Sequence, residues 1–87
     1  MPAVHFLPES VQIEADGERF VPHVLASERA DGMWEAWIEF RPMDGGSPRV
    51  TDRESTQPNR AAVEYWASGL EPVYFEGAFE RATKRLG

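Results

Sequence analysis

Apolar and polar side chains alternate along residues 11–41 with the period of two that is typical of β-strands. The alternation is most regular over 34–41. Two sets of side chains point to opposite sides there, namely Trp34, Ala36, Ile38 and Phe40, and Glu35, Trp37, Glu39 and Arg41. Asp-Gly pairs, which favour tight turns, recur at 16–17, 31–32 and 44–45. The pattern predicts antiparallel strands at 11–15, 18–29 and 34–41, with 49–52 as a candidate short fourth strand.

The connection between the second and third strands decides which side chains face each other. A two-residue loop would place Arg29 in the core, whereas the three-residue loop Ala30-Asp31-Gly32 with a left-handed Gly32 gives one consistently apolar face. We therefore expect the second register, with these cross-strand pairs: Val24–Ile38, Ala26–Ala36, Pro22–Phe40, Leu25–Trp37, Ser27–Glu35, His23–Glu39 and Glu28–Trp34. Pro22 cannot donate to a strand partner, so it marks an unpaired edge position or a bulge.

Helical spacing begins after residue 51. One helix carries Ala62, Val63, Trp66, Ala67 and Leu70, and Gly69 is placed to end it. Ser55 or Thr56 would cap this helix, with Pro58 in its first turn. A second helix begins at Glu71-Pro72 and carries an apolar stripe of Phe75, Phe79, Ala82 and Leu86; a short strand over 73–75 is the alternative. The predicted fold class is α+β: an antiparallel three- to four-stranded meander sheet followed by two helices packed on one face.

The composition excludes several classes of protein. The 87 residues are 41% hydrophobic with ten aromatic residues (Trp 3, Tyr 2, Phe 5), enough for one small domain spanning residues 1–87. No cysteine is present, which excludes a disulfide scaffold and a thiolate metal site. The longest apolar run falls far short of the roughly 20 residues of a membrane-spanning helix, and no signal peptide is visible. We expect a cytoplasmic protein that does not enter a membrane.

The net charge of −6 lies entirely in the first half of the chain. Residues 1–48 hold nine acids against Arg19, Arg29 and Arg41, whereas six acids balance six bases in residues 49–87. Such a surface repels phosphate backbones, so binding to nucleic acid is disfavoured. It would attract a basic partner, or imitate nucleic acid toward a protein that binds one. The simplest role of the charge is solubility.

Groups that could carry catalysis are scarce. The sequence has no phosphate-binding glycine loop, no Gly-x-Ser-x-Gly motif and no His-Glu-x-x-His motif, which favours a protein that is not an enzyme and has no cofactor. His5 and His23 are too few for a zinc site. In the expected register Glu39 lies across from His23, and its carboxylate would favour the charged imidazole.

The polar segment from Thr51 to Arg60 is a candidate ligand site. It lies beside a helix N-terminus, where anions bind readily, so a small anionic ligand is one candidate occupant. The residues proposed for that ligand are Arg53, Thr56, Gln57, Asn59, Arg60 and, further along the helix, Tyr65. The simpler interpretation, which we favour, is a solvated connection with a helix cap.

The second face of the sheet is a candidate interface. Its apolar side chains are Val21, Leu25 and Trp37, with Met33 near the hairpin end, and polar neighbours include His23, Glu35 and Glu39. A tryptophan with aliphatic neighbours is costly to leave in water, and two helices already cover the other face. Either the segment 4–7 folds over this face or another chain covers it. We favour the second, most simply in a twofold homodimer.

Three functional hypotheses follow, in order of preference. The first is a small acidic, non-catalytic binding or regulatory module that acts through protein–protein contact and self-associates through the Trp37 face. The second is a small-ligand-binding protein or minor enzyme that uses residues 51–66. The third is an acidic inhibitor that mimics nucleic acid.

Overall fold

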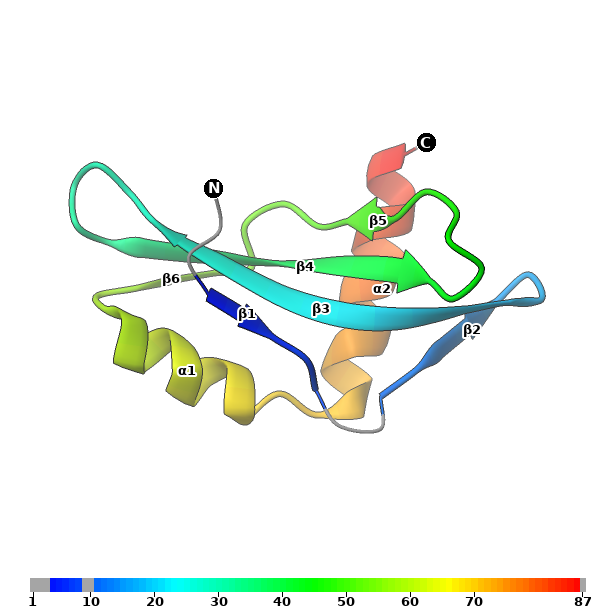
Figure 1. The fold of residues 1–87 in the computed structure, drawn as a ribbon, viewed down its shortest axis with the longest axis horizontal. Coiled ribbons are helices and arrows are strands. Elements are labelled where there is room, and N and C mark those ends of the chain that lie inside the picture. The colour runs from blue at the N-terminus through cyan, green and yellow to red at the C-terminus, as the bar shows by residue number, and fades with distance from the viewer. Residues whose placement is uncertain (1–3, 9–10, 87) are drawn as a thin grey trace.

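The computed structural model of the chain describes residues 4–8 and 11–86. It contains six strands followed by two helices (Figure 1). The strands are β1 (Val4–Phe6), β2 (Ile13–Ala15), β3 (Glu18–Glu28), β4 (Trp34–Pro42), β5 (Arg49–Val50) and β6 (Ser55–Gln57). The helices are α1 (Arg60–Ser68) and α2 (Pro72–Leu86). The α+β class, with an antiparallel sheet followed by two helices, is confirmed.

A long central hairpin, β3–β4, organises the sheet. Two short strands pair with the free edge of each long strand: β1 and β2 pair with opposite ends of β3, and β5 and β6 pair with opposite ends of β4. On one edge of β3, Pro22 lies between the segment that pairs with β2 and the segment that pairs with β1. On the other edge of β3 its partner is Phe40 of β4. The expected place of Pro22 at an unpaired edge position is therefore confirmed.

The register of the central hairpin is the one expected from the three-residue loop. Val24 faces Ile38, Leu25 faces Trp37, and the other predicted pairs also form. Gly32 has a φ of 86°, a conformation that glycine adopts without strain, and the amide of Arg29 donates to the carbonyl of Met33 across the loop.

Both helices pack on the same face of the sheet, which we call the inner face (Figure 1). One cluster joins α2 to the sheet through Phe20, Val24, Ile38, Phe40, Phe75, Ala78, Phe79 and Ala82. A second, under α1, contains Val4, Ala26, Ala36 and Val63. The prediction of helices on one face is confirmed, and the alternative strand over 73–75 is wrong because these residues belong to α2.

Two elements differ from the sequence-based expectation in the segment before α1. Residues 55–57 form β6 on the edge of β4, so neither Ser55 nor Thr56 caps the helix. Asn59 is the N-cap, and its Oδ1 accepts a hydrogen bond of 2.8 Å from the amide of Ala62. Pro58 precedes that cap instead of lying in the first turn. Gly69 does end α1, as expected, by donating its amide back to the helix carbonyls.

The N-terminal segment takes a third course, beyond the two considered from the sequence. It neither folds over the second face nor leaves the sheet, because Val4–Phe6 pair with Val24–Ala26 of β3 as an edge strand. Val4 then contributes to the inner core, and His5 points to the opposite face. Neither helix of the described chain is long and apolar enough to cross a membrane.

Candidate functional site

The face of the sheet opposite the helices, which we call the outer face, is the strongest candidate site. Its central positions are alternate residues of the two long strands, namely Val21, His23, Leu25 and Ser27 of β3 and Glu35, Trp37, Glu39 and Arg41 of β4. Pairing adds His5, Val50 and Thr56 from the short strands. Within residues 4–8 and 11–86, no helix packs on this face.

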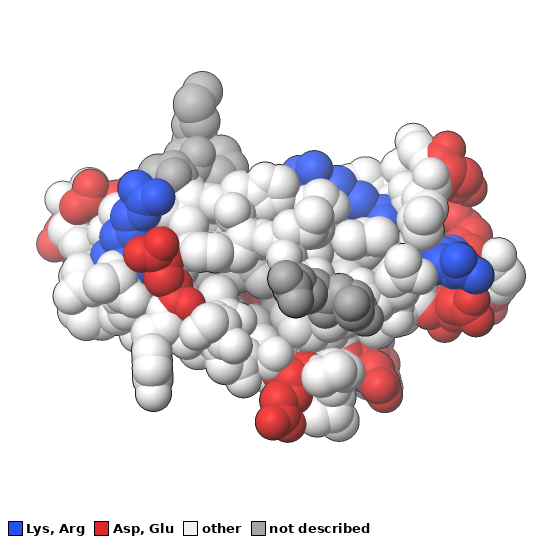
Figure 2. All heavy atoms as spheres, turned by 60° about the horizontal axis from the view of Figure 1, so that its bottom comes forward, with Lys and Arg blue, Asp and Glu red and all other residues white. Residues whose placement is uncertain are grey.

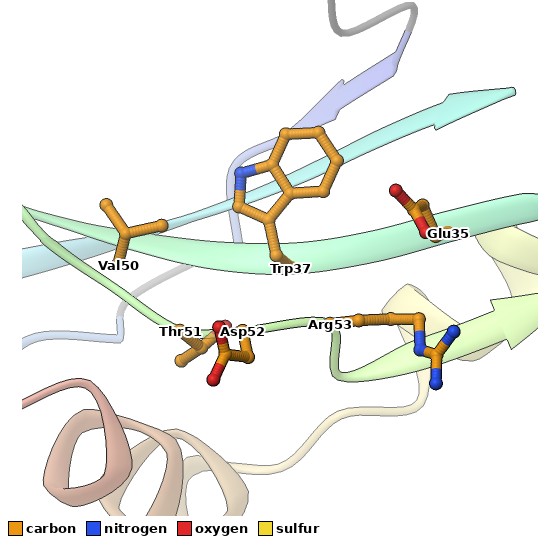
Figure 3. A pocket seen from close by; sticks show the side chains of 6 residues that line it. All are labelled: Glu35, Trp37, Val50, Thr51, Asp52 and Arg53. Carbon is orange, nitrogen blue, oxygen red and sulfur yellow. The ribbon is translucent and has the colours of Figure 1, made fainter. Parts of the chain in front are cut away.

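Trp37 and Leu25 form the apolar centre of the outer face. They are direct cross-strand partners, and Leu25 is only 6% exposed although neither described helix lies over it. Trp37 is half-buried, as are Val21 and Val50. Figure 3 shows the indole of Trp37 standing out from β4 on the same side as Val50 and Glu35. The described chain therefore covers Leu25 and leaves Trp37 partly open to solvent.

Charges of both signs surround this centre. Nε of Arg41 donates to Oε1 of Glu39 at 2.8 Å, and Glu35 is half-buried beside Trp37. Met33 is half-buried in the hairpin end, outside the strands. The structure thus brings together most of the interface residues proposed from the sequence: Val21, His23, Leu25, Glu35, Trp37 and Glu39 share one face.

The two histidines meet on the outer face. Nε2 of His5 and Nδ1 of His23 lie 2.7 Å apart in a hydrogen bond between β1 and β3. The pKa of His23 lies below its usual 6.5, first because burial disfavours the charged ring and then because of Arg41 and His5; Glu39 opposes the shift. Glu39 does favour the charged imidazole, as expected, but burial, Arg41 and His5 outweigh its effect, so the net shift of the pKa is downward.

A shallow hollow of about 290 Å³ opens beside Trp37, where the chain between β5 and β6 leaves the edge of β4 (Figure 3). The amide of Thr51 donates to the carbonyl of Ile38, and that of Glu54 donates to the carbonyl of Ala36. The two residues between these anchors, Asp52 and Arg53, are exposed. The hollow is lined by Glu35, Trp37, Val50, Thr51, Asp52 and Arg53.

The residues proposed for ligand binding do not converge on that hollow. Of the six, Arg53 alone lines it. Thr56 faces outward from β6, opposite Glu35, and Gln57 donates to Ser55 Oγ at 2.7 Å. Asn59 is committed to capping α1, Arg60 is exposed at the first position of that helix, and Tyr65 is 83% exposed on it.

A polar cluster around the buried carboxylate of Glu54 was missed by sequence reasoning. The side chain of Glu54 is 8% exposed and accepts hydrogen bonds from Oη of Tyr74 at 2.6 Å and from the guanidinium of Arg81. Tyr74 and Arg81 lie 20 and 27 residues from Glu54 along the chain, so no local sequence motif predicts these contacts. The cluster fixes the segment that follows the hollow against α2. With its donors and acceptors paired, it is a structural clamp.

Comparison with known proteins adds no relative. The chain matches no family of known proteins, no curated protein and no solved structure at a significant level. The function is therefore argued from the geometry of the site.

Proposed function

We propose that this protein is a small non-catalytic module that acts through protein–protein contact, and that a second copy of the chain binds its outer face. The observation that carries the proposal is the half-buried Trp37 over Leu25, on a sheet face to which no described helix contributes a cover. An apolar centre surrounded by polar groups is the usual anatomy of a protein interface.

The outer face is large enough for a stable interface. A standard interface buries about 800 Å² on each partner, roughly one seventh of the 5481 Å² accessible surface of this chain. The molecule measures 40 by 25 by 20 Å along its principal axes, and the central hairpin runs along the longest of them (Figure 1). Burying the rest of Trp37 contributes only about 1–2 kcal/mol at about 25 cal/mol per Å². The contact must therefore include Val21, Val50 and the polar rim.

The distribution of charge suits self-association of this face. In a twofold interface the same patch meets itself, so a patch that carries both signs can pair acids with bases across the axis. The outer face offers Arg41 and the carboxylates of Glu35 and Glu39 around one apolar centre. A purely acidic face would instead repel its own copy.

The nucleic-acid mimic is the weaker proposal. A mimic needs acids arranged along a continuous surface, in place of phosphates. In the view of Figure 2 the acids gather at the ends and lower rim of the molecule, and the middle is mostly uncharged. On this side of the molecule the acids therefore form no continuous surface of the kind that a mimic needs.

The hollow beside Trp37 supports a second candidate function, the binding of a small ligand. An indole wall and the guanidinium of Arg53 could hold a planar or anionic group. Two carboxylates, Glu35 and Asp52, line the same hollow and oppose an anion. A titration with phosphate, nucleotides and small carboxylates tests this function: saturable NMR shifts of the Trp37 indole and Arg53 amide would support it, and their absence would remove it.

Sedimentation equilibrium tests the leading proposal. We expect the wild-type chain to exceed its monomer mass of 9.8 kDa at micromolar concentrations and above. Trp37→Glu should return the mass to that of the monomer while the circular dichroism spectrum stays native. The matched control is Tyr65→Ser, which removes an aromatic ring that is 83% exposed on α1, away from the outer face. A wild-type monomer throughout the range, or dissociation by Tyr65→Ser as well, contradicts the proposal.

A further inference from the structure

Two imidazole nitrogens from different strands are aimed at each other on the outer face. His5 lies on β1 opposite Leu25, and His23 is two residues from Leu25 on β3, so the two rings are diagonal neighbours. The facing atoms, Nε2 of His5 and Nδ1 of His23, are 2.7 Å apart, while the ring centres are 4.9 Å apart. The two nitrogens therefore lie between the ring centres, and the rings meet at their edges.

The protonation that this contact needs is compatible with metal binding. A hydrogen bond between two imidazoles requires an N–H on one ring and a lone pair on the other. A pair of neutral imidazoles supplies both, and the neutral ring is the form that binds metals.

We propose that His5 and His23 form a bidentate binding site for a divalent first-row transition-metal ion, held by Nε2 of His5 and Nδ1 of His23. The ion replaces the hydrogen bond between the two rings and lies to one side of the line that joins the two nitrogens, because a gap of 2.7 Å is too short to hold it between them. The ring that carried that hydrogen on its facing nitrogen becomes protonated on its other nitrogen, so both imidazoles stay neutral and no proton is released overall.

To bind one ion, both rings must turn so that their nitrogens point at the ion instead of at each other. Metal–nitrogen bonds of about 2.0–2.1 Å hold neighbouring ligands roughly 3 Å apart, slightly more than the present 2.7 Å. His5 is exposed and His23 is half-buried, so both rings can turn about their side-chain bonds. The backbone of His5 is held by the pairing of β1 with β3, and that of His23 by the pairing of β3 with β4. The two nitrogens therefore stay close to each other.

The ligand set determines which ions the site takes. Within the described residues, no group of three or more His, Cys, Asp or Glu side chains is placed to hold a metal. Two imidazoles remain too few for a closed zinc site, so the proposed site is an open pair in which water completes the coordination. Imidazole nitrogen favours Cu²⁺, then Ni²⁺ and Zn²⁺, while Mg²⁺ and Ca²⁺ prefer oxygen ligands.

Calorimetric titration of the full chain with Zn²⁺ alone at neutral pH tests the site. We expect one ion per chain, and His5→Ala and His23→Ala should each weaken binding at least about tenfold, because either change leaves a single ligand. Glu14→Gln, which removes an exposed acid on β2, is the matched control and should leave the affinity unchanged. Circular dichroism checks that each variant is folded.

Two further readouts separate chelation from general attraction to an acidic protein. Zn²⁺ should shift the ¹⁵N resonances of His5 Nε2 and His23 Nδ1, and Mg²⁺ should shift neither. The Trp37→Ala variant, which removes the indole without adding a carboxylate beside His5, should bind Zn²⁺ as the wild type does, so failure of self-association and failure of the metal site are distinguishable. The proposal is overturned if Zn²⁺ binding is not saturable, if both histidine variants bind Zn²⁺ with the wild-type affinity, or if Mg²⁺ binds as tightly as Zn²⁺.

Discussion

Oη of Tyr74 on α2 donates a hydrogen bond of 2.6 Å to Oε1 of Glu54, the residue that precedes β6. The guanidinium of Arg81 pairs with the same carboxylate and lies 5.7 Å from the centre of the Tyr74 ring. This contact joins the last helix to the edge segment that ends beside Trp37. One buried carboxylate therefore ties α2 to the segment that follows the hollow.

Tyr74 should make stability fall in alkaline solution. Burial, followed by the hydrogen bond and charge of Glu54, raises the pKa of Tyr74 to about 12 from 10.0. The folded state holds this proton more tightly than the unfolded chain, so the stabilisation is complete below pH 10 and is lost as the pH rises toward 12. Denaturant unfolding over this range should show a steeper loss for the wild type than for Tyr74→Phe. Tyr65→Phe, at an exposed tyrosine, should keep the wild-type slope; an unchanged slope in Tyr74→Phe would refute the prediction.

Gly77→Ala should stabilise the protein by up to about 1 kcal/mol, because glycine is the weaker helix former. Gly77 lies within α2, and an added Cβ would meet only Nη1 of Arg81, at 3.4 Å. Thermal unfolding should give a higher Tm. Gly45→Ala is the contrasting variant and should lower the Tm, because Gly45 has a φ of 84°. A lower Tm for Gly77→Ala would mean that Arg81 cannot move without losing its contact with Glu54.

Trp34 and Trp37 should respond differently to substitution. Trp34 packs on the inner face against the cluster of Val4, Ala36 and Val63, and it is half-buried at the end of β4. We expect Trp34→Ala to cost about 2–4 kcal/mol of unfolding free energy. Trp37→Ala should cost the dilute monomer clearly less, since its indole is half-buried without a helix over it. Equal costs in denaturant titrations would mean that the two faces are assigned wrongly.

The central hairpin could be predicted because its information is local. Nine cross-strand pairs follow from one alternating pattern and one left-handed glycine, Gly32. β1 and β6 could not be predicted in this way, since three residues are too few to show a period. β6 is also a polar Ser-Thr-Gln segment on a sheet edge, so its sequence resembles a loop.

In the candidate site, too, local features could be predicted from the sequence and contacts between distant segments could not. The face that contains Leu25 and Trp37 was predictable because both residues belong to the long hairpin. The contact between His5 and His23 was not, because it depends on the pairing of β1 with β3. The clamp at Glu54 depends on the packing of α2 and likewise has no local signal.

Isotope-filtered NOE spectroscopy on a mixture of labelled and unlabelled chains tests self-association through the outer face most directly, because it detects contacts between copies alone. We expect intermolecular NOEs from the Trp37 indole to the methyl groups of Val21, Leu25 or Val50 of the second copy. Intermolecular NOEs confined to α1 or α2, or none at concentrations where the chain is an oligomer by sedimentation, would contradict self-association through the outer face.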